Sequence, residues 1–246
     1  MLKPNACVLV LGFFGVVATA SADRVTADTG QFTLLTTPPP SVTGTSGLAN
    51  DTTAYGFFEN SVILNTALNV DAKGAGLYTM TAQLTGGTIA AGTAVQSFFL
   101  TAQVATFPAS GYRSYTGSIT FDAPILGVEV VTTSLNNTDS LLGAPGTVYP
   151  APSDTNSGLE LNTPGCQQGP PAATQCGDDE FSISADGHTL GFFMSTGQSE
   201  DQMRVILGVV KTPEPGSIGL AFLGLLLVAI PVAKQYRGRK SLRREA

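Results

Sequence analysis

Hydrophobic and polar residues alternate with a period of two along most of the chain between residues 23 and 211. Successive side chains of a β-strand point to opposite faces, so this pattern predicts strands with one face on a core and the other in water. Gly, Pro, Asn and Asp separate the runs, and we find no capped helical pattern of about ten residues or more. The hydrophobic members of the runs are Tyr78, Met80, Ala82 and Leu84; Phe98, Leu100, Ala102 and Val104; Tyr115, Gly117, Ile119 and Phe121; Leu126, Val128 and Val130; Leu190, Phe192 and Met194; and Val205, Leu207 and Val209.

The sequence therefore predicts an all-β body of roughly nine to twelve short strands. Such a number of strands with frequent turn signals is typical of a single antiparallel β-sandwich, of which the jelly roll is one form. Two segments lack a clear strand pattern, residues 36–51 and residues 135–173. The second segment is long for a loop in a compact domain, which makes it a candidate binding surface.

The N-terminus has the features of a secretory signal peptide. Lys3 precedes an uncharged apolar run over residues 8–18, and Ala20 and Ala22 supply the small side chains that signal peptidase requires. We therefore predict that residues 1–22 are a signal peptide, which directs the chain through the Sec translocon and is then removed by signal peptidase. The alternative is a membrane anchor, but a membrane-spanning helix needs about 20 apolar residues, more than this run provides.

A second apolar stretch follows Glu214 and contains no charge until Lys234. A helix over residues 216–233, rising about 1.5 Å per residue, would cover most of the ~30 Å hydrocarbon thickness of a bilayer. The tail 234–246 then carries half of the basic residues of the chain: Lys234, Arg237, Arg239, Lys240, Arg243 and Arg244. Basic clusters favour the cytoplasmic side, so we predict one transmembrane helix with the body outside and the tail inside. A buried core helix is the alternative, but it would not need these cations.

Pro213, Glu214 and Pro215 stand directly before this stretch. The order of Pro-Glu-Pro, a membrane-length helix and a basic tail resembles the PEP-CTERM sorting signal of exported Gram-negative bacterial proteins, which also carry an N-terminal Sec signal. The resemblance covers residues 213–246, and its one mild departure is a tail that mixes Lys and Gln with Arg and ends in the acidic Glu245. It implies an exosortase-like membrane peptidase that recognises a sorting region over residues 212–246 and processes the chain near Pro213 to Pro215.

On this interpretation the protein is first an inner-membrane intermediate, with its body in the periplasm and its tail in the cytoplasm. The body, residues 23–211, is then delivered to the cell envelope or the extracellular space. The alternative is a simple C-terminally anchored membrane protein that keeps its tail.

The exported body is strongly acidic. Residues 23–211 carry 16 acidic and 5 basic side chains, a net charge of −11 against −6 for the whole chain. Because nucleic-acid binding requires clustered Lys and Arg, we expect no nucleic-acid partner. An acidic exported surface favours solubility, and it makes divalent cations candidate partners.

The body contains two cysteines, Cys166 and Cys176. Outside the cytoplasm an even number of cysteines favours a disulfide, which we predict between these two. A zinc site is the alternative, but His188 is the only histidine and the chain has no Cys-x-x-Cys.

Acidic residues gather after Cys176 at Asp178, Asp179, Glu180 and Asp186. Calcium takes several oxygen ligands, which carboxylates and loop carbonyls can provide. No EF-hand spacing is present, and a solvated acidic turn is the simpler interpretation. We therefore expect no cofactor, with calcium as the alternative.

Catalytic motifs are not apparent in the sequence. It has no Gly-x-Ser-x-Gly turn to accompany His188, no Walker loop and no Gly-x-Gly-x-x-Gly. We predict a non-enzymatic envelope or extracellular-matrix protein, as in a biofilm, with a structural or adhesive role and extracellular polysaccharide as a candidate partner. The alternatives are a secreted carbohydrate-binding module, which the lack of Trp weakens, and an extracellular hydrolase that uses a carboxylate pair.

Overall fold

The computed structural model describes residues 24–44, 47–106, 112–153, 156–162, 178–197 and 200–209. These residues belong to one compact unit, Asp23–Val210. Several predictions lie outside the described residues: the signal peptide with Ala20 and Ala22, the pair Cys166 and Cys176, and the whole sorting region 212–246. Within the described ranges, no helix has the length and apolar character that a membrane crossing needs.

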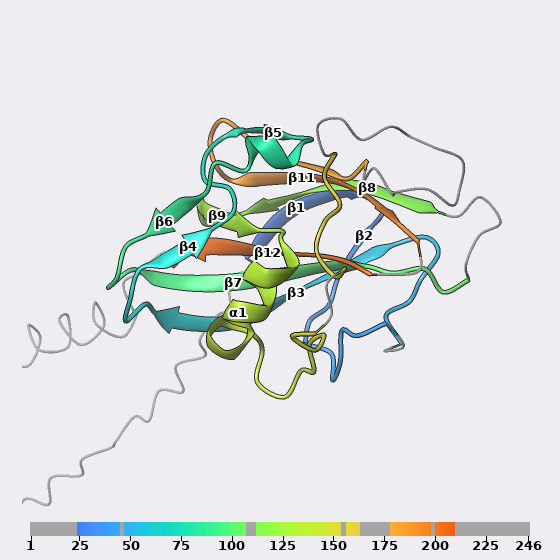
Figure 1. The fold of residues 1–246 in the computed structure, drawn as a ribbon, viewed down its shortest axis with the longest axis horizontal. Coiled ribbons are helices and arrows are strands. Elements are labelled where there is room, and N and C mark those ends of the chain that lie inside the picture. The colour runs from blue at the N-terminus through green and yellow to red at the C-terminus, as the bar shows by residue number, and fades with distance from the viewer. Residues whose placement is uncertain are drawn as a thin grey trace, which may run out of the picture. The chain divides into compact units, whose positions relative to one another are not determined.

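The described chain is mainly β, as predicted, and its strands form two five-stranded sheets and a two-stranded one (Figure 1). The first sheet has the order β1-β8-β11-β10-β5, the second has the order β2-β3-β7-β12-β9, and β4 pairs with β6. All pairs of strands are antiparallel except β2 with β3. The strands are β1 (Val25–Gly30), β2 (Phe32–Leu34), β3 (Ala54–Ile63), β4 (Leu68–Val70), β5 (Gly76–Tyr78), β6 (Gly87–Ile89), β7 (Ala94–Ala102), β8 (Arg113–Phe121), β9 (Ile125–Glu129), β10 (Glu180–Ile183), β11 (Thr189–Thr196) and β12 (Asp201–Gly208).

Both five-stranded sheets contribute side chains to one hydrophobic core. From the first sheet come Tyr115, Ile119 and Phe121 of β8 with Leu190, Phe192 and Met194 of β11; from the second come Phe98 and Leu100 of β7 with Val205 and Leu207 of β12. The rings of Phe98 and Phe121 meet edge to face across the core at 5.1 Å. These residues are the alternating ones of the sequence, so the period-two pattern correctly predicts the inner faces of β7, β8, β11 and β12.

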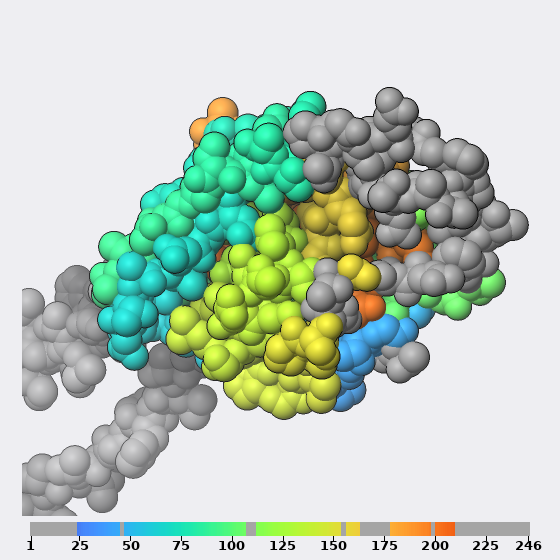
Figure 2. Space-filling view, viewed as in Figure 1, coloured from blue at the N-terminus to red at the C-terminus, as the bar shows by residue number. Residues whose placement is uncertain are grey.

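The second sheet is covered on its outer face as well. β7 and β12 are buried on both faces, unlike β11, which alternates between buried and half-buried residues. Two smaller hydrophobic clusters form the cover, one with Ile206 and Leu142 and the other with Phe99 and Leu135. In the space-filling view, the helix that supplies Leu135 and Leu142 covers the middle of this face (Figure 2).

That helix, α1 (Thr132–Leu142), is 11 residues long and is not predicted by the sequence, in which we find no capped helical pattern of about ten residues or more. Its sequence is rich in Thr, Ser and Asn, which have low helix propensity, and the N-cap residue Val131 has no capping side chain. Asp71 replaces the missing cap from beyond β4. One Asp71 oxygen accepts the N–H groups of Val130 and Val131 at 2.7 and 2.8 Å, and the other accepts the Ser134 hydroxyl at 2.6 Å. A distant carboxylate thus stabilises a helix that local signals do not predict.

The alternating run through Met80, Ala82 and Leu84 also departs from the predicted strand. β5 ends at Tyr78, and Thr81–Gln83 form a 3₁₀-helix. The Gln83 side-chain oxygen accepts the N–H groups of Thr79 and Met80 at 2.6 and 2.9 Å, which turns the chain away from the sheet. Alternation over so few residues does not distinguish a strand from a turn whose side chain captures the backbone donors.

Residues 156–162, called the strap below, connect the two sheets (gold in Figure 1). Near its start, the N–H of Leu159 donates to Val130 O, just after β9, at 2.9 Å. At its end, Asn162 exchanges backbone hydrogen bonds with Thr79 and Thr81, just after β5, at 3.1 Å each. The strap therefore spans from the second sheet to the first.

Candidate metal centre

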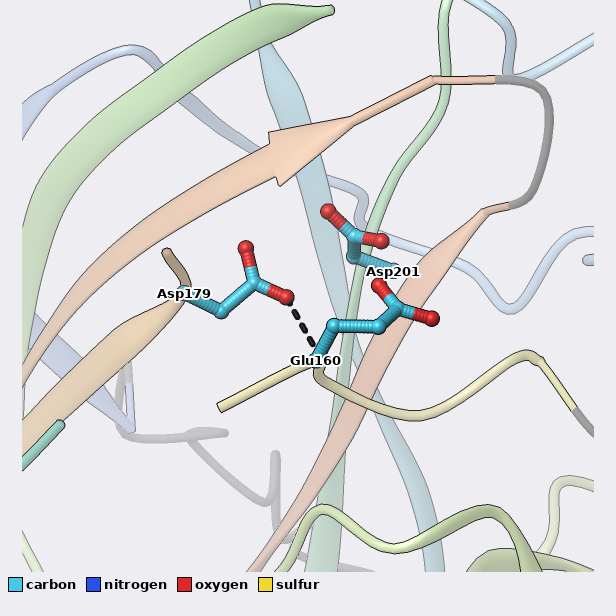
Figure 3. A group of neighbouring side chains, drawn as sticks. All are labelled: Glu160, Asp179 and Asp201. Carbon is cyan, nitrogen blue, oxygen red and sulfur yellow. Dashed lines mark hydrogen bonds between the residues drawn. The ribbon is translucent and has the colours of Figure 1, made fainter. Parts of the chain in front are cut away.

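Three carboxylates from different parts of the fold meet beside the strap (Figure 3). Glu160 belongs to the strap, Asp179 directly precedes β10 of the first sheet, and Asp201 is the first residue of β12 in the second sheet. One oxygen from each lies within 4.8 Å of the others. We call these three residues the acidic triad.

The strand pattern explains why two of these acids point inward. Asp201 shares a face of β12 with Met203 and Val205, and Asp179 is in phase with the buried Phe181 on β10. Each acid thus occupies the core-facing position at the start of a strand. Asp179 and Asp201 are each only 1% exposed.

Hydrogen bonds hold Asp179 firmly and leave Asp201 incompletely satisfied. The two oxygens of Asp179 accept the backbone N–H groups of Glu160 at 2.7 Å and Ser195 at 2.6 Å. The Oδ2 atom of Asp201 is buried and has no hydrogen-bond partner among the described residues. Within the same part of the chain, no Lys, Arg or His forms an ion pair with any of the three acids.

Burial of three acids together disfavours their ionised forms. Desolvation, with the charge of Asp179 adding to it, raises the pKa of Glu160 to about 7. Desolvation also raises the pKa of Asp179 to about 6, although its two backbone hydrogen bonds oppose the rise. The pKa of Asp201 lies well above its usual range, because this residue is buried and faces both other acids.

An arrangement of this kind can do one of two things chemically. Neighbouring carboxylates can share protons, which removes the repulsion between them. Alternatively, they can bind a cation, and a set of oxygen donors suits hard ions such as Ca²⁺ or Mg²⁺ better than Zn²⁺, which favours nitrogen and sulfur.

Of the four acids that the sequence singles out for calcium, the structure brings only Asp179 into the triad. Asp178 is exposed, and Glu180 is half-buried on β10. Asp186 lies in the turn at the other end of β10, where it accepts the Ser184 hydroxyl and the His188 N–H. These hydrogen bonds lower the pKa of Asp186, as expected for a solvated turn. Sequence reasoning missed Glu160 and Asp201, since neither stands in an acidic run.

A second buried ionic group lies on the opposite face of β12, around Arg204, which is fully buried. The Arg204 guanidinium donates to both oxygens of Glu59, at 2.7 and 2.9 Å, and to Asp139 of α1 at 2.8 Å. Its remaining donors reach Thr138 Oγ1 at 2.7 Å and Leu135 O at 3.1 Å, both in α1. We call this group the Arg204 cluster.

Aromatic and acidic side chains complete the Arg204 cluster. The guanidinium lies 5.3 Å from the ring centroid of Phe99 and 5.5 Å from that of Tyr149, whose hydroxyl donates to Glu59 at 2.6 Å. Burial raises the pKa of Glu129 to about 8, against the opposing effects of Thr138 and Arg204. Burial alone would lower the pKa of Arg204, but the charges of Glu59 and Glu129 hold it above its usual value. The cluster therefore joins α1 to the second sheet as a charge-compensated unit.

His188, the only histidine of the chain, binds the backbone and not a catalytic partner. Its Nδ1 lies 3.1 Å from the carbonyl oxygen of Phe121, which can only accept a hydrogen bond, so Nδ1 carries the proton. Searches against family models, curated proteins and solved structures found no match to this chain.

Proposed function

We propose that the chain is an exported protein of the cell envelope or extracellular matrix, sorted through its C-terminal region. The observation that carries this proposal is the order of three features: Pro213 to Pro215, the apolar residues 216–233, and the basic tail 234–246. The apolar N-terminal residues 1–22 support it, because a sorted protein must first be exported. The Sec machinery, an inner membrane and an exosortase-like peptidase are the partners that follow.

We also propose that the exported body is a β-sandwich with a structural or adhesive role, and that it has no enzymatic activity. The two five-stranded sheets with a shared core support the sandwich. The acidic character of the body supports an extracellular role in which the protein stays soluble. The engagement of His188 with the backbone gives no support to a Ser–His–Asp hydrolase.

The sorting proposal is tested by intact mass and cell fractionation in the native host. The mature wild-type chain should begin at Asp23, end near Pro213 and lie outside the inner membrane. Replacing Pro213, Glu214 and Pro215 together by Ala should leave export intact but keep the chain in the inner membrane with Ala246 at its end.

A matched pair of single substitutions sharpens this test. Glu214→Ala should block C-terminal processing, whereas Glu245→Ala makes the same change outside the motif and should not. A wild-type chain that still ends at Ala246 in the inner membrane would overturn the sorting proposal and indicate a simple anchored protein.

A further inference from the structure

We propose that the acidic triad of Glu160, Asp179 and Asp201 binds a calcium ion that ties the two sheets and the strap together. The proposal is independent of how the chain is sorted, because it rests only on the geometry of the described body. Four features of the triad support it: the spacing of the oxygens, an unsatisfied buried atom, uncompensated charge and the type of donor.

The spacing of the carboxylates fits one calcium ion. Calcium–oxygen distances are about 2.3–2.6 Å, so oxygens on opposite sides of one ion lie roughly 4.6–5.2 Å apart. The triad offers one oxygen from each residue with no separation above 4.8 Å. The three oxygens therefore lie close to the spacing that one ion requires, and small side-chain rotations would complete it.

The unsatisfied buried atom belongs to Asp201, and this observation does not depend on the spacing of the three carboxylates. Its Oδ2 atom has no hydrogen-bond partner among the described residues, although the side chain is 1% exposed. Buried polar atoms are almost always partnered, and each exception calls for an explanation. Figure 3 shows the carboxylates of Asp201 and Glu160 facing each other, with Asp179 approaching from β10. A cation held among these groups within reach of Asp201 Oδ2 would supply the missing partner.

The negative charge of the triad is not compensated by the residues that the structure describes. In the described part of the chain, the triad has no ion pair with a basic side chain, in contrast to the Arg204 cluster on the other face of β12. The exposed Asp178 adds negative potential to both Asp179 and Asp201. Three neighbouring carboxylates, two of them buried and one half-buried, are costly to ionise without a counter-charge, and a divalent cation removes most of that cost.

The donor set points to calcium among the divalent ions. The three ligands are carboxylates, which suit hard ions. Magnesium demands nearly octahedral geometry at about 2.0–2.1 Å and gives up its water reluctantly, whereas calcium accepts irregular shells of six to eight oxygens. Ligands from a strap and two separate strands form an irregular set, and Glu160, which is only half-buried, leaves room for water to complete the shell.

Calcium would act here as a cross-link. Asp179 already holds the strap by accepting the Glu160 N–H, and Leu161 forms a parallel bridge with Asp179. An ion bound to the side chains of Glu160 and Asp201 would add the second sheet to this contact. Because it binds the folded chain only, calcium should raise the thermal midpoint, and the rise should grow with the logarithm of the calcium concentration above the Kd.

The test uses the full-length chain purified in detergent, stripped with EGTA and titrated with CaCl2 in a calorimeter at pH 8. Calcium should bind saturably to one site and raise the thermal midpoint, and MgCl2 at the same concentration should do so less. Loss of an outer-shell partner alone commonly costs about 10–100-fold in metal affinity, so Asp201→Asn and Glu160→Gln should each weaken calcium binding at least about tenfold.

Two control variants make the same chemical changes outside the triad. Asp186→Asn and Glu180→Gln should leave calcium affinity unchanged. Glu160→Gln also guards against a folding defect in Asp201→Asn, since Glu160 is half-buried on the strap, and circular dichroism would verify both folds. The proposal would be overturned if the wild type bound no calcium saturably, or if both triad variants bound calcium as tightly as the wild type. It would also be overturned if magnesium raised the thermal midpoint as much as calcium does.

Discussion

Charged side chains are buried in two opposite ways on the two faces of β12. On the outer face, Arg204 is surrounded by acids and acceptors, and each of its nitrogens donates a hydrogen bond to Glu59 or to residues of α1. On the inner face, Asp201 meets two further acids and keeps one oxygen without a partner. The difference is one of counter-charge: Arg204 pairs with the acids of its cluster, although Glu129 Oε1 also lacks a hydrogen-bond partner there. The triad, in contrast, pairs with no basic side chain among the described residues and needs a proton or a ligand.

The largest expected effect comes from breaking the compensated face. Arg204→Met should lower the free energy of unfolding by about 3–5 kcal/mol, because the buried Glu59 and the partly buried Asp139 lose their counter-charge. Urea denaturation would measure this loss. Arg113→Met, which removes a half-exposed ion pair with Asp51, is the control and should change the midpoint little. Equal effects of the two substitutions would show that the Arg204 cluster does not stabilise the fold.

A substitution on the inner face of β12 should change the free energy of unfolding in the opposite direction. Without calcium at pH 8, Asp201→Asn should raise the free energy of unfolding by about 1–3 kcal/mol, because it removes a buried carboxyl group that must either take up a proton on folding or stay ionised without a counter-charge. With saturating calcium, the same substitution should be destabilising relative to the wild type. The two urea curves, with EGTA and with CaCl2, would decide the matter, and destabilisation in both would contradict an uncompensated site.

The pH dependence of stability follows from the same acids. The pKa values of Asp179, Glu160 and Glu129 are raised to about 6, 7 and 8, above the usual values near 4. Between about pH 4 and pH 8 the folded chain therefore holds protons that the unfolded chain has released, so stability falls as the pH rises. In EGTA the free energy of unfolding should drop by several kcal/mol from about pH 5 to pH 8, since each pKa unit corresponds to about 1.4 kcal/mol.

Single substitutions show which acids cause the free energy of unfolding to fall with pH. Glu160→Gln should flatten this dependence between about pH 4 and pH 7, and Glu129→Gln should flatten it over the whole range up to about pH 8. Calcium should reverse the dependence of the wild type, because ligand carboxylates must be deprotonated and calcium binding improves as they ionise. A flat profile in EGTA would contradict the raised pKa values.

The smallest expected effect concerns a carboxylate that is already satisfied. Asp71→Ala should lower the free energy of unfolding by about 1 kcal/mol, because the start of α1 loses its acceptor. Asp71→Asn retains one side-chain oxygen and should cost less. Thermal unfolding of the two variants would measure the difference, and equal losses would indicate that charge and not hydrogen bonding is what α1 requires.

Local periodicity was sufficient to predict the inner faces of the long strands. Residues Ile119 and Phe121 of β8, and Leu190 and Phe192 of β11, were recognised because a half-buried strand repeats every two residues. α1 was missed for the converse reason. Its residues have low helix propensity, and its cap, Asp71, lies about sixty residues earlier in the chain.

The acidic triad shows a different limit of sequence reasoning. Adjacency in sequence groups Asp179 with Asp178 and Glu180, but neighbours along an extended chain point to opposite faces. The real companions, Glu160 and Asp201, lie 19 and 22 residues away and meet Asp179 only after the sheets and strap have formed. The alternation in β12 places Asp201 on the face of Val205, but it does not reveal which other strand contributes an acid.

The place of β12 in the chain also sets when the body can be completed during synthesis. β12 is the last strand of the described body, yet it lies between β7 and β9 within the second sheet. Because ribosomes build a chain from its N-terminus, β7 and β9 lack their shared neighbour until residue 208 has been made. A chain that stops before Asp201 therefore exposes two unpaired strand edges, and such edges pair with other chains. Premature termination should yield an aggregating fragment and not a shorter folded protein.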